Sequence, residues 1–398
     1  MAKKVLISGA SIAGPTAGIV LGRAGIETTI VEKSSSLRDG GYPVDIRGAA
    51  LDVTERLGLL SDLRKSHVDM QRITITAAGG RKIGPFHPYL LSGGSGPDAE
   101  VPRGAFAAVL YEASKDIVKY RFNDSIASVK QDSDGVDVFF SSGHQERYDI
   151  VIGAEGLHSN LRQMVFGPES QFERYIGYCF TGFSLPNPER WVNDIFMHNA
   201  PGKLATIFAA HADRPLISVM AFRYPGSPFT VAPTPAQQRE LTAQVYKDER
   251  DGIVPRLLEA LETADDLYFD TVSQIRMPKW SSGRVVLSGD AAHATSFLSG
   301  QGTSVALVGS YVLANEIATK ESYEEAFAAY EAVFRNFAEI NQDLVHGGSS
   351  VMIPDTMEEI DQRNAAIEAA LAAPGSENDL HGDYARPHYS AIDLPAYN

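Results

Sequence analysis

The chain has 398 residues, of which 35 are lysine or arginine and 50 are aspartate or glutamate, so its formal net charge is −15. An acidic balance of this size argues against a general attraction to nucleic acid or to anionic lipid. Hydrophobic residues make up 44% of the chain and charged residues 21%, which is enough apolar material for a sizeable core. At this length we expect one large domain or two interleaved domains.

Cys179 is the only cysteine, so the chain can form no intrachain disulfide and no cysteine-based metal cluster. Its neighbours Tyr178 and Phe180 predict a buried packing thiol. No run of about 18 apolar residues is present, so we expect no membrane insertion. The apolar stretch near the N-terminus is broken at once by Gly9, which indicates a strand entering a turn and not a signal peptide. A cytoplasmic protein is expected.

The beginning of the chain predicts a strand, a helix and a second strand. Residues 4–8 form a short apolar run, residues 12–24 carry apolar side chains at helical spacing, and residues 27–32 are rich in β-branched side chains. Pro15 falls in the first turn of the helix, where a missing N–H costs nothing, and Gly25 is a suitable residue to end it. These features predict a βαβ unit in its shortest form.

The turn between the first strand and its helix reads GASIAG over residues 9–14. A dinucleotide pyrophosphate needs a tight turn, a close backbone approach and the exposed N–H groups of a helix start. Gly9 and Gly14 meet the first and last of these needs, and Ser11 is small enough to permit the approach. Glu32 ends the second strand, where a carboxylate can accept hydrogen bonds from an adenosine ribose. We predict a dinucleotide site formed by Gly9, Ser11, Ile12, Ala13, Gly14, Glu32 and Lys33.

The predicted secondary structure changes in kind at about residue 172. From there to residue 275 strand-like runs follow one another, which indicates an antiparallel sheet rather than further βαβ units. Helical spacing predicts helices at 50–64, 103–118 and 235–264, and a glycine-rich loop is expected at 92–96. Alternating or apolar runs predict strands at 72–78, 124–131, 135–140, 147–152, 178–185, 204–210 and 216–224.

A further glycine turn follows a predicted buried strand at residues 284–288. The strand delivers Asp290 to its tip, where an ionised carboxylate can accept from a polyol hydroxyl. Gly300 and Gly302 open a helix expected from about 302 to 318, whose positive end can stabilise negative charge on a reduced flavin ring. His293 lies nearby, but no second ligand stands at metal spacing, so we interpret it as a structural histidine bonded to backbone and predict no metal site.

The C-terminal part begins with a long amphipathic helix predicted over residues 322–345. Its aromatic stripe is assigned to the core. The tail from residue 373 has little periodicity and is predicted to be loop or weakly docked. The stripe consists of Phe327, Tyr330, Val333, Phe334 and Phe337.

Three segments, in this order and spacing, carry a family resemblance: residues 9–14, residues 149–156, and residues 283–293 with the glycines that follow. The chain resembles the single-component FAD-dependent aromatic hydroxylases of the para-hydroxybenzoate hydroxylase type. Within that family it is similar to the branch that includes tetracycline-inactivating and polyketide-tailoring monooxygenases, a branch associated with antibiotic modification. The resemblance covers about residues 1–345.

The resemblance implies an α/β fold in which a Rossmann-like FAD-binding domain is interleaved with an antiparallel-sheet substrate domain, followed by a long C-terminal helix. The implied FAD-binding parts are residues 1–71, 101–171 and 276–320. The implied substrate-domain parts are residues 72–100 and 172–275, and residues 321–398 form the C-terminal helix and tail.

The resemblance also implies roles for single residues. Arg47 matches an arginine near the pyrophosphate or the incoming nicotinamide nucleotide, and Arg103 matches one that contacts the flavin's linking chain. Asp290 matches the aspartate on the ribityl chain, and residues 149–156 match the motif between FAD and NADPH. The implied cofactor-binding set is completed by Gly289, Gly300, Gly302 and Thr303, the last three beside the flavin ring.

Two positions depart from the family's pattern. Glu155 replaces the usual aspartate and is one methylene longer, so its contact to NADPH is expected to differ. Phe297 replaces the usual proline near the flavin and the substrate, so an unusual floor of the active site is expected. Phe208 and Val219, on neighbouring strands of the predicted sheet, join Phe297 as predicted substrate contacts, and no catalytic base is assigned.

The activity implied by the resemblance is oxygenation of a small aromatic substrate. NADPH or NADH would reduce FAD, and O2 would then add to form a flavin hydroperoxide that transfers one oxygen atom. An apolar substrate sheet above the flavin suits the exclusion of water from that species. No second βαβ fingerprint is present, in agreement with transient nicotinamide binding.

Alternative functions stay open at this point. Flavin-dependent halogenation is disfavoured because neither Trp191 nor Trp280 lies in a paired-tryptophan motif. A Baeyer–Villiger or epoxidising flavoenzyme on the same scaffold is not excluded by the residues. A flavoprotein that binds an aromatic drug without turning it over is a third possibility. The expected assembly is a monomer or a homodimer.

Overall fold

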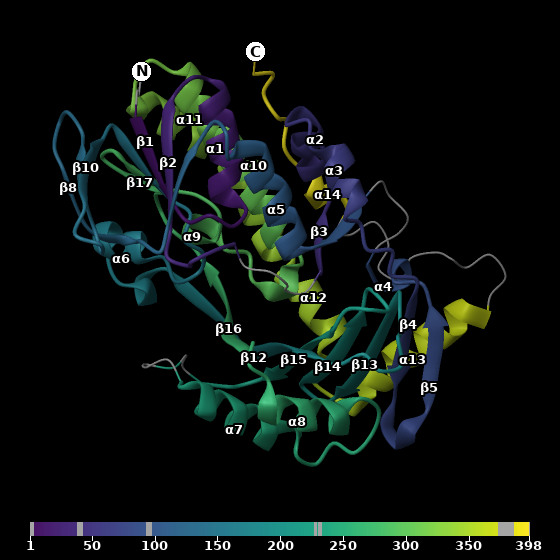
Figure 1. The fold of residues 1–398 in the computed structure, drawn as a ribbon. Helices are drawn as coiled ribbons and strands as arrows, with labels where there is room; N and C mark the ends of the chain where they lie inside the picture. Colours follow the sequence, from purple (N-terminus) through teal and green to yellow (C-terminus); the bar gives the residue numbers. More distant parts are fainter. Residues whose placement is uncertain are drawn as a thin grey trace.

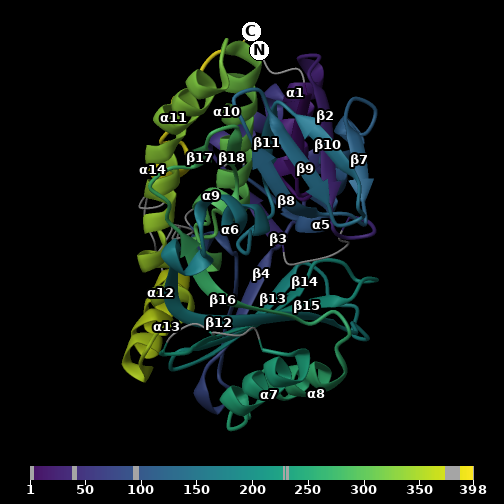
Figure 2. The same ribbon diagram turned by 90° about the vertical axis from the view of Figure 1, so that its left-hand side faces the viewer.

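A computed structural model describes residues 4–37, 43–92, 98–226, 229, 233–372 and 386–397. Residues 93–96 of the predicted glycine-rich loop and residues 373–385 of the tail lie outside this described part. Figures 1 and 2 show two layers, a nucleotide-binding layer with a parallel sheet and a second layer built on another sheet. The predicted α/β fold, with a parallel sheet, an antiparallel sheet and a long C-terminal helix, is confirmed, and two smaller sheets accompany it.

The first layer contains a six-stranded sheet of order β17-β18-β11-β1-β2-β7. All neighbouring pairs from β18 to β7 are parallel, and β17 is antiparallel to β18. Its central strands are apolar runs because helices and loops cover both faces. The strands are β1 (Lys4–Ser8), β2 (Glu27–Glu32), β7 (Lys119–Phe122), β11 (Ile150–Gly153), β17 (Ser281–Ser282) and β18 (Val285–Leu287).

Helix α1 (Ala13–Arg23) packs on β1 and β2 of this sheet, α5 (Arg103–Ser114) and α10 (Gly302–Thr319) pack on α1, and α11 (Tyr323–Asp343) packs on α10. The aromatic stripe of α11 is in the core as predicted, since its members are buried or packed against buried residues. The remaining elements of this layer are β3 (Pro43–Ile46), α2 (Ala49–Arg56), α3 (Leu60–Lys65), β6 (Ala99–Pro102), β8 (Ile126–Gln131), β9 (Val136–Phe140), β10 (Gln145–Tyr148), α6 (Asn160–Phe166), η2 (Glu169–Gln171) and α9 (Asp290–His293).

The second layer is a seven-stranded sheet of order β16-β12-β15-β14-β13-β4-β5. It is antiparallel, as predicted, except that β4 runs parallel to β13. Strands β5, β13 and β16 were not predicted. The strands are β4 (Arg72–Thr76), β5 (Lys82–Phe86), β12 (Glu173–Leu185), β13 (Asp194–Ala200), β14 (Lys203–Ala209), β15 (Leu216–Arg223) and β16 (Tyr268–Ile275), with η1 (Ala78–Gly80) and α4 (Tyr89–Ser92) beside them.

The two faces of this second sheet are covered by different elements. Helices α7 (Pro235–Tyr246) and α8 (Val254–Thr263) lie under one face, away from the first layer (Figure 1). Cys179 is buried on that side, which confirms the predicted packing thiol. The other face packs against residues of η3 (Phe297–Ser299), α12 (Val345–Met352) and α13 (Met357–Ala372). That face is therefore the one that meets the nucleotide-binding layer.

The described end of the tail, residues 386–397, is packed against the first layer. Tyr389, at the end of α14 (Arg386–Tyr389), is buried. Arg56 donates to the carbonyl oxygen of Pro395 at 2.7 Å, and the Tyr397 hydroxyl donates to Glu316 at 2.8 Å. These residues are mostly loop, as predicted, but they are not weakly docked, because single side chains such as Tyr389 are buried against the first layer.

The chain order of the strands shows how the two layers interleave. The first sheet takes strands from residues 4–32, 119–153 and 281–287, and the second takes them from residues 72–86 and 173–275. The limits given above for each domain stay predictions. None of the helices in the described residues is both long enough and apolar enough to cross a membrane.

Candidate active site

The predicted pyrophosphate turn connects β1 to α1 and lies against the end of β11. Gly9 has a φ of +110°, and a Cβ built there would lie 2.3 Å from the carbonyl oxygen of Ala154. A Cβ at Gly14 would lie 1.9 Å from the carbonyl oxygen of Gly9. Both positions therefore require glycine, and the turn brings backbone and the first N–H groups of α1 to one place, as an anionic ligand requires.

Glu32 is fixed beside this turn. Its carboxylate accepts from the backbone N–H of Ala10 at 3.0 Å and from that of Ser34 at 2.9 Å. A carboxylate has about four acceptor positions, so two are still available to ribose hydroxyls. Lys33, the next residue, is exposed at the end of β2.

The strand β18 brings a second turn to the same region. Gly289 has a φ of +63°, and a Cβ there would lie 2.9 Å from Cβ of Ala13, so glycine allows α9 to begin against α1. Asp290 is the first residue of α9, and burial raises its pKa while the nearby charge of Arg103 opposes the shift. Arg103 also donates from Nη2 to Oγ of Ser11 at 3.2 Å. The structure thus brings Ser11, Arg103 and Asp290 together.

The start of α10 completes this group. A Cβ at Gly302 would lie 3.9 Å from Oδ1 of Asp290, and Thr303 is half-buried in the same helical turn. Gly300, with a φ of +65°, is exposed at the end of η3. Oε1 of Gln301 is buried without a hydrogen-bond partner among the described residues.

Two further observations test whether these residues fit FAD. Oγ of Ser296 is also buried without a partner among the described residues, and Ser296 has a φ of +82°. Buried polar atoms are normally hydrogen-bonded, so Ser296 and Gln301 suit a ligand that carries its own donors and acceptors. With two glycine turns, a carboxylate for a polyol chain and a helix start, the residues fit FAD.

Arg47 is held differently from the other predicted cofactor residues. Its Nη2 lies 3.0 Å from Oδ2 of Asp45, and its Nε lies 3.8 Å from Oδ2 of Asp98. It also donates to the hydroxyl of Tyr389 at 3.3 Å. The backbone N–H of Arg47 donates to Oγ of Ser304 at 3.3 Å, which places the residue beside the first turn of α10. Its predicted contact to a nucleotide stays a prediction.

Glu155, which departs from the family's aspartate, is occupied by contacts within the protein. It accepts from the hydroxyls of Ser8 and Ser159 and from the backbone N–H of Leu161, each at 2.7 Å. The carboxylate therefore joins the end of β1 to the start of α6. The fully buried Arg162 continues this connection, since it donates to the carbonyl oxygen of Ala291 in α9 at 3.0 Å.

The three predicted substrate contacts lie on the same face of the second sheet. The ring of Phe297 stacks on that of Phe180, with centroids 4.8 Å apart and an interplanar angle of 10°. Phe208 packs on the same apolar cluster. Val219 is two residues from Ala221, a member of that cluster, and side chains two apart on a strand share a face. Phe297 thus joins the loop before α10 to the apolar side of the sheet.

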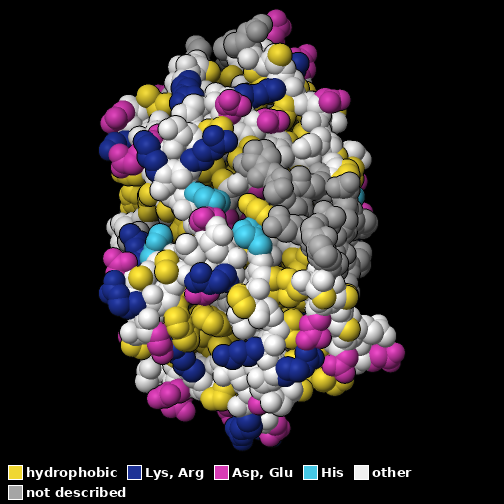
Figure 3. Space-filling model, turned by 90° about the vertical axis from the view of Figure 1, so that its right-hand side faces the viewer, with side chains coloured by type: hydrophobic (Ala, Val, Ile, Leu, Met, Phe, Trp, Pro, Cys, Tyr) yellow, Lys and Arg dark blue, Asp and Glu magenta, His cyan; other side chains and the backbone are white. Residues whose placement is uncertain are grey.

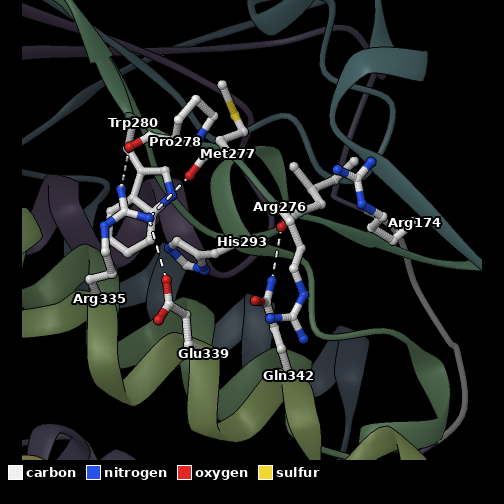
Figure 4. A pocket seen from close by; sticks show the side chains of 10 residues that line it. Arg174, Arg276, Met277, Pro278, Trp280, His293, Arg335, Glu339 and Gln342 are labelled. Atoms are coloured by element: carbon white, nitrogen blue, oxygen red, sulfur yellow. Dashed lines mark hydrogen bonds and ion pairs between the residues drawn. The ribbon is translucent and has the colours of Figure 1, made fainter.

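His293 lies on the other side of this region, in a pocket of about 290 Å³ (Figure 4). Its Nε2 lies 3.1 Å from the Tyr330 hydroxyl, and burial lowers its pKa to about 3. Its ring is hydrogen-bonded to a side chain where a backbone partner was predicted, and the structural role itself stays a prediction. In the same pocket Arg335 stacks on Trp280 and donates to the carbonyl oxygen of Met277 at 3.0 Å. These contacts hold α11 to the loop after β16, and none of the predicted cofactor or substrate residues lines this pocket.

On the face shown in Figure 3, basic and acidic side chains are interspersed rather than gathered by sign. Within the described residues no group of three or more His, Cys, Asp or Glu side chains is arranged to hold a metal ion.

Several residues of the site were missed by sequence reasoning. Gln301 stands between two predicted glycines, so the motif itself could have suggested it. Ser296, Phe180 and Tyr389 gave no such signal, because their positions depend on a strained loop residue, on strand pairing and on the docked tail.

Comparisons with known proteins agree with this geometry. The family model described as "FAD binding domain" matches residues 2–343. An uncharacterized protein of Mycobacterium tuberculosis is 38% identical over 366 residues, covering 90% of this chain and 97% of that protein. A flavin-dependent monooxygenase from an unknown prokaryotic organism is 34% identical over 370 residues, covering 92% of this chain and 95% of that protein.

Solved structures show the same likeness. Tetracycline destructase Tet(55) superposes with a TM-score of 0.85 at 31% identity over 99% of both chains. HpxO of Klebsiella pneumoniae, complexed with FAD and uric acid, has a TM-score of 0.70 at 20% identity over 92% of both chains, and shows the fold alone. The resemblance drawn from the sequence is confirmed, and the chain belongs to the FAD-binding family of flavin-dependent monooxygenases.

Proposed function

We propose that this chain uses NADPH or NADH and O2 to hydroxylate an aromatic or polycyclic phenolic substrate. The observation that carries the proposal is the stack of Phe297 on Phe180, which joins the loop of the candidate flavin site to the apolar face of the second sheet. A planar apolar substrate is the ligand that such a face would accept next to a flavin.

The protein's own part in this reaction is to bind, orient and exclude water. Gly9, Ser11 and Gly14 would hold the pyrophosphate, Glu32 the ribose, and Asp290 the polyol chain. The start of α10 would stabilise negative charge on the ring system. When bound, the flavin would supply the redox chemistry that activates oxygen. The apolar sheet face would keep water away from the reacting atoms.

The kind of substrate is supported by the relatives. Two of the solved structures similar to this chain, at 31% and 30% identity, are tetracycline destructases. We therefore include tetracyclines, which are polycyclic phenols, among the candidate substrates, and antibiotic modification among the candidate roles.

The test uses the purified FAD-loaded protein. Oxidation of NADPH and of NADH is followed with and without tetracycline, 2-naphthol and naphthalene, and the product is analysed after reaction under 18O2. We expect a phenolic compound to increase nucleotide oxidation several-fold and to gain one atom of 18O. Absence of 18O from every product would contradict hydroxylation. If 18O is instead found in an ester or an epoxide, the reaction is a Baeyer–Villiger oxygenation or an epoxidation and not a hydroxylation.

A further inference from the structure

Thr206, in the middle of β14, has a buried hydroxyl that makes no hydrogen bond to any described residue. The side chain is 2% exposed, and Oγ1 has no partner. Leaving a buried hydroxyl unpaired costs free energy, so such a group in a folded protein calls for an explanation.

The hydroxyl lies on the face of the sheet that meets the nucleotide-binding layer. Leu204 and Phe208, two residues to either side on β14, both belong to the apolar cluster on that face. Side chains alternate along a strand, so Thr206 shares their face. Its partners across the strand pairs are Met197 on β13 and Val219 on β15. A single hydroxyl is therefore surrounded by apolar side chains.

Val219, Gly182 and Ala221 lie between this hydroxyl and the Phe180–Phe297 stack. In the strand register Thr206 pairs with Val219, which pairs with Gly182, and Phe180 pairs with Ala221. Phe180 is thus two strands and two residues from Thr206, a separation of about 12 Å by ordinary sheet spacings. Gly182 has no side chain and Ala221 has only a methyl group, so side chains project little from this part of the sheet surface. We call the sheet surface between Thr206 and Phe180 the floor.

The open side of this floor is the side toward Gly182 and Phe208. Both residues are half-buried, whereas Leu204 and Ala221 on the other side are buried. Thr206 lies between the half-buried residues Gly182 and Phe208 and the buried residues Leu204 and Ala221. Oγ1 of Thr206 is itself covered by other side chains, so a flat ligand that lies along the floor would reach the hydroxyl only once those side chains move aside.

We propose that Thr206 is a specificity-determining residue, whose hydroxyl pairs with a hydroxyl or keto group of a polycyclic substrate that lies along this floor against Phe297. The proposal rests on the proposed function and adds which group of the substrate, a hydroxyl or a keto oxygen, the site recognises. A threonine hydroxyl can donate and accept, so it can pair with either group. A hydrocarbon of the same shape would leave it unpaired, and a site built in this way rejects such analogues.

The test compares Thr206→Val with a matched control in the same sheet. Thr181 on β12 is also fully buried, but its hydroxyl donates to the carbonyl oxygen of Tyr268 at 2.9 Å. Thr181→Val removes a hydrogen bond and should lower the thermal unfolding temperature of the FAD-loaded protein by a few degrees. Thr206→Val removes an unpaired hydroxyl and should leave that temperature unchanged or raise it.

Binding is measured without nucleotide, by the change in flavin absorbance on titration with 2-naphthol or naphthalene. We expect the wild-type protein to prefer 2-naphthol, and Thr206→Val to weaken its binding about tenfold while binding of naphthalene is unchanged or stronger. Thr206→Ser should keep most of the preference, and Thr181→Val all of it.

The outcomes separate this proposal from the proposed function. Equal binding of 2-naphthol by wild type and Thr206→Val, no preference for 2-naphthol in the wild type, or loss of thermal stability in Thr206→Val equal to that in Thr181→Val would each overturn the role of Thr206. Thr206-dependent binding without 18O in any product would instead uphold this site and contradict hydroxylation.

Discussion

The two sides of the candidate site are built by different means. On the nucleotide side, glycines at backbone contacts and a few paired polar groups leave little freedom, as at Gly9, Gly14 and Glu32. On the sheet side, apolar side chains from several strands form the surface, and the hydroxyl of Thr206 has no hydrogen-bond partner among the described residues.

This difference indicates that specificity for the cofactor and specificity for the substrate have different structural origins. Under the proposed function, the cofactor would be recognised by backbone geometry, which tolerates almost no substitution. The substrate would be recognised by side chains on a pleated surface, where a change alters shape without breaking the fold. Substitutions on the nucleotide side should therefore affect folding and FAD binding together, and those on the sheet side should affect ligand preference.

The largest effect is expected from Gly14→Ala. The new Cβ would lie 1.9 Å from the carbonyl oxygen of Gly9, so the turn or α1 must move. We expect a loss of about 3 kcal/mol or more in the free energy of unfolding and a protein that purifies without flavin colour. Denaturant unfolding and visible absorbance measure both.

Gly58→Ala is the matched control for this change. Gly58, unlike Gly14, has a positive φ of +74°, but a Cβ there meets nothing within 4 Å. Its cost should be about 1 kcal/mol from backbone strain alone, with FAD retained. Equal effects of the two substitutions would show that the close approach in the turn is not what holds the cofactor.

The next effect concerns Asp290. Removal of a charged acceptor from a hydroxyl donor weakens binding by about 1.5–3 kcal/mol, so Asp290→Asn should weaken FAD binding roughly 10- to 100-fold. Because burial raises the pKa of Asp290, the ionised acceptor is lost on acidification earlier than for an ordinary aspartate. FAD affinity should fall as the pH falls through that raised pKa, and equilibrium dialysis over a pH series should show no such fall in Asp290→Asn. A parallel fall in both proteins would assign the pH dependence elsewhere.

The same contrast explains how much could be predicted from the sequence. Gly9 and Gly14 could be predicted because their turn admits only glycine at these places, and Asp290 because it follows a buried strand and matches the family's aspartate. The strands around them were also predicted nearly to the residue, since buried parallel strands are plain apolar runs.

The sheet side was less predictable for a physical reason. Thr206 and Phe180 matter through strand pairing between segments far apart in sequence, and one sequence does not reveal that register. Phe208 and Val219 were predicted as substrate contacts only from their places on neighbouring strands, and that role stays a prediction; nothing in the sequence marked Thr206. Tyr389 was missed because hydrophobic residues in the tail do not recur at helical or strand spacing.

The smallest effect is expected at the contact that joins the two layers. Nε2 of His158, in the loop after β11, lies 3.0 Å from Oδ1 of Asp270 on β16, and Nδ1 lies 2.8 Å from Glu169. The hydrogen bonds and charges of Asp270 and Glu169 raise the pKa of His158 to about 10. Because the folded pKa is raised, the stabilisation is fully present below the ordinary pKa of about 6.5 and is lost as the pH rises toward 10.

His158 is more than half exposed, so solvent screening keeps the effect small. His158→Gln should lower the free energy of unfolding by about 1 kcal/mol or less at pH 6, less in high salt, and by nothing measurable near pH 10. Lys65→Gln, which breaks an exposed pair with Asp62 within one helix, is the control without a link between layers.

If His158→Gln changes FAD binding but not 2-naphthol binding, the contact belongs to the nucleotide side alone. If it alters the binding of 2-naphthol while FAD binding holds, then the contact sets how the sheet lies against the flavin, and the two regions are coupled through it.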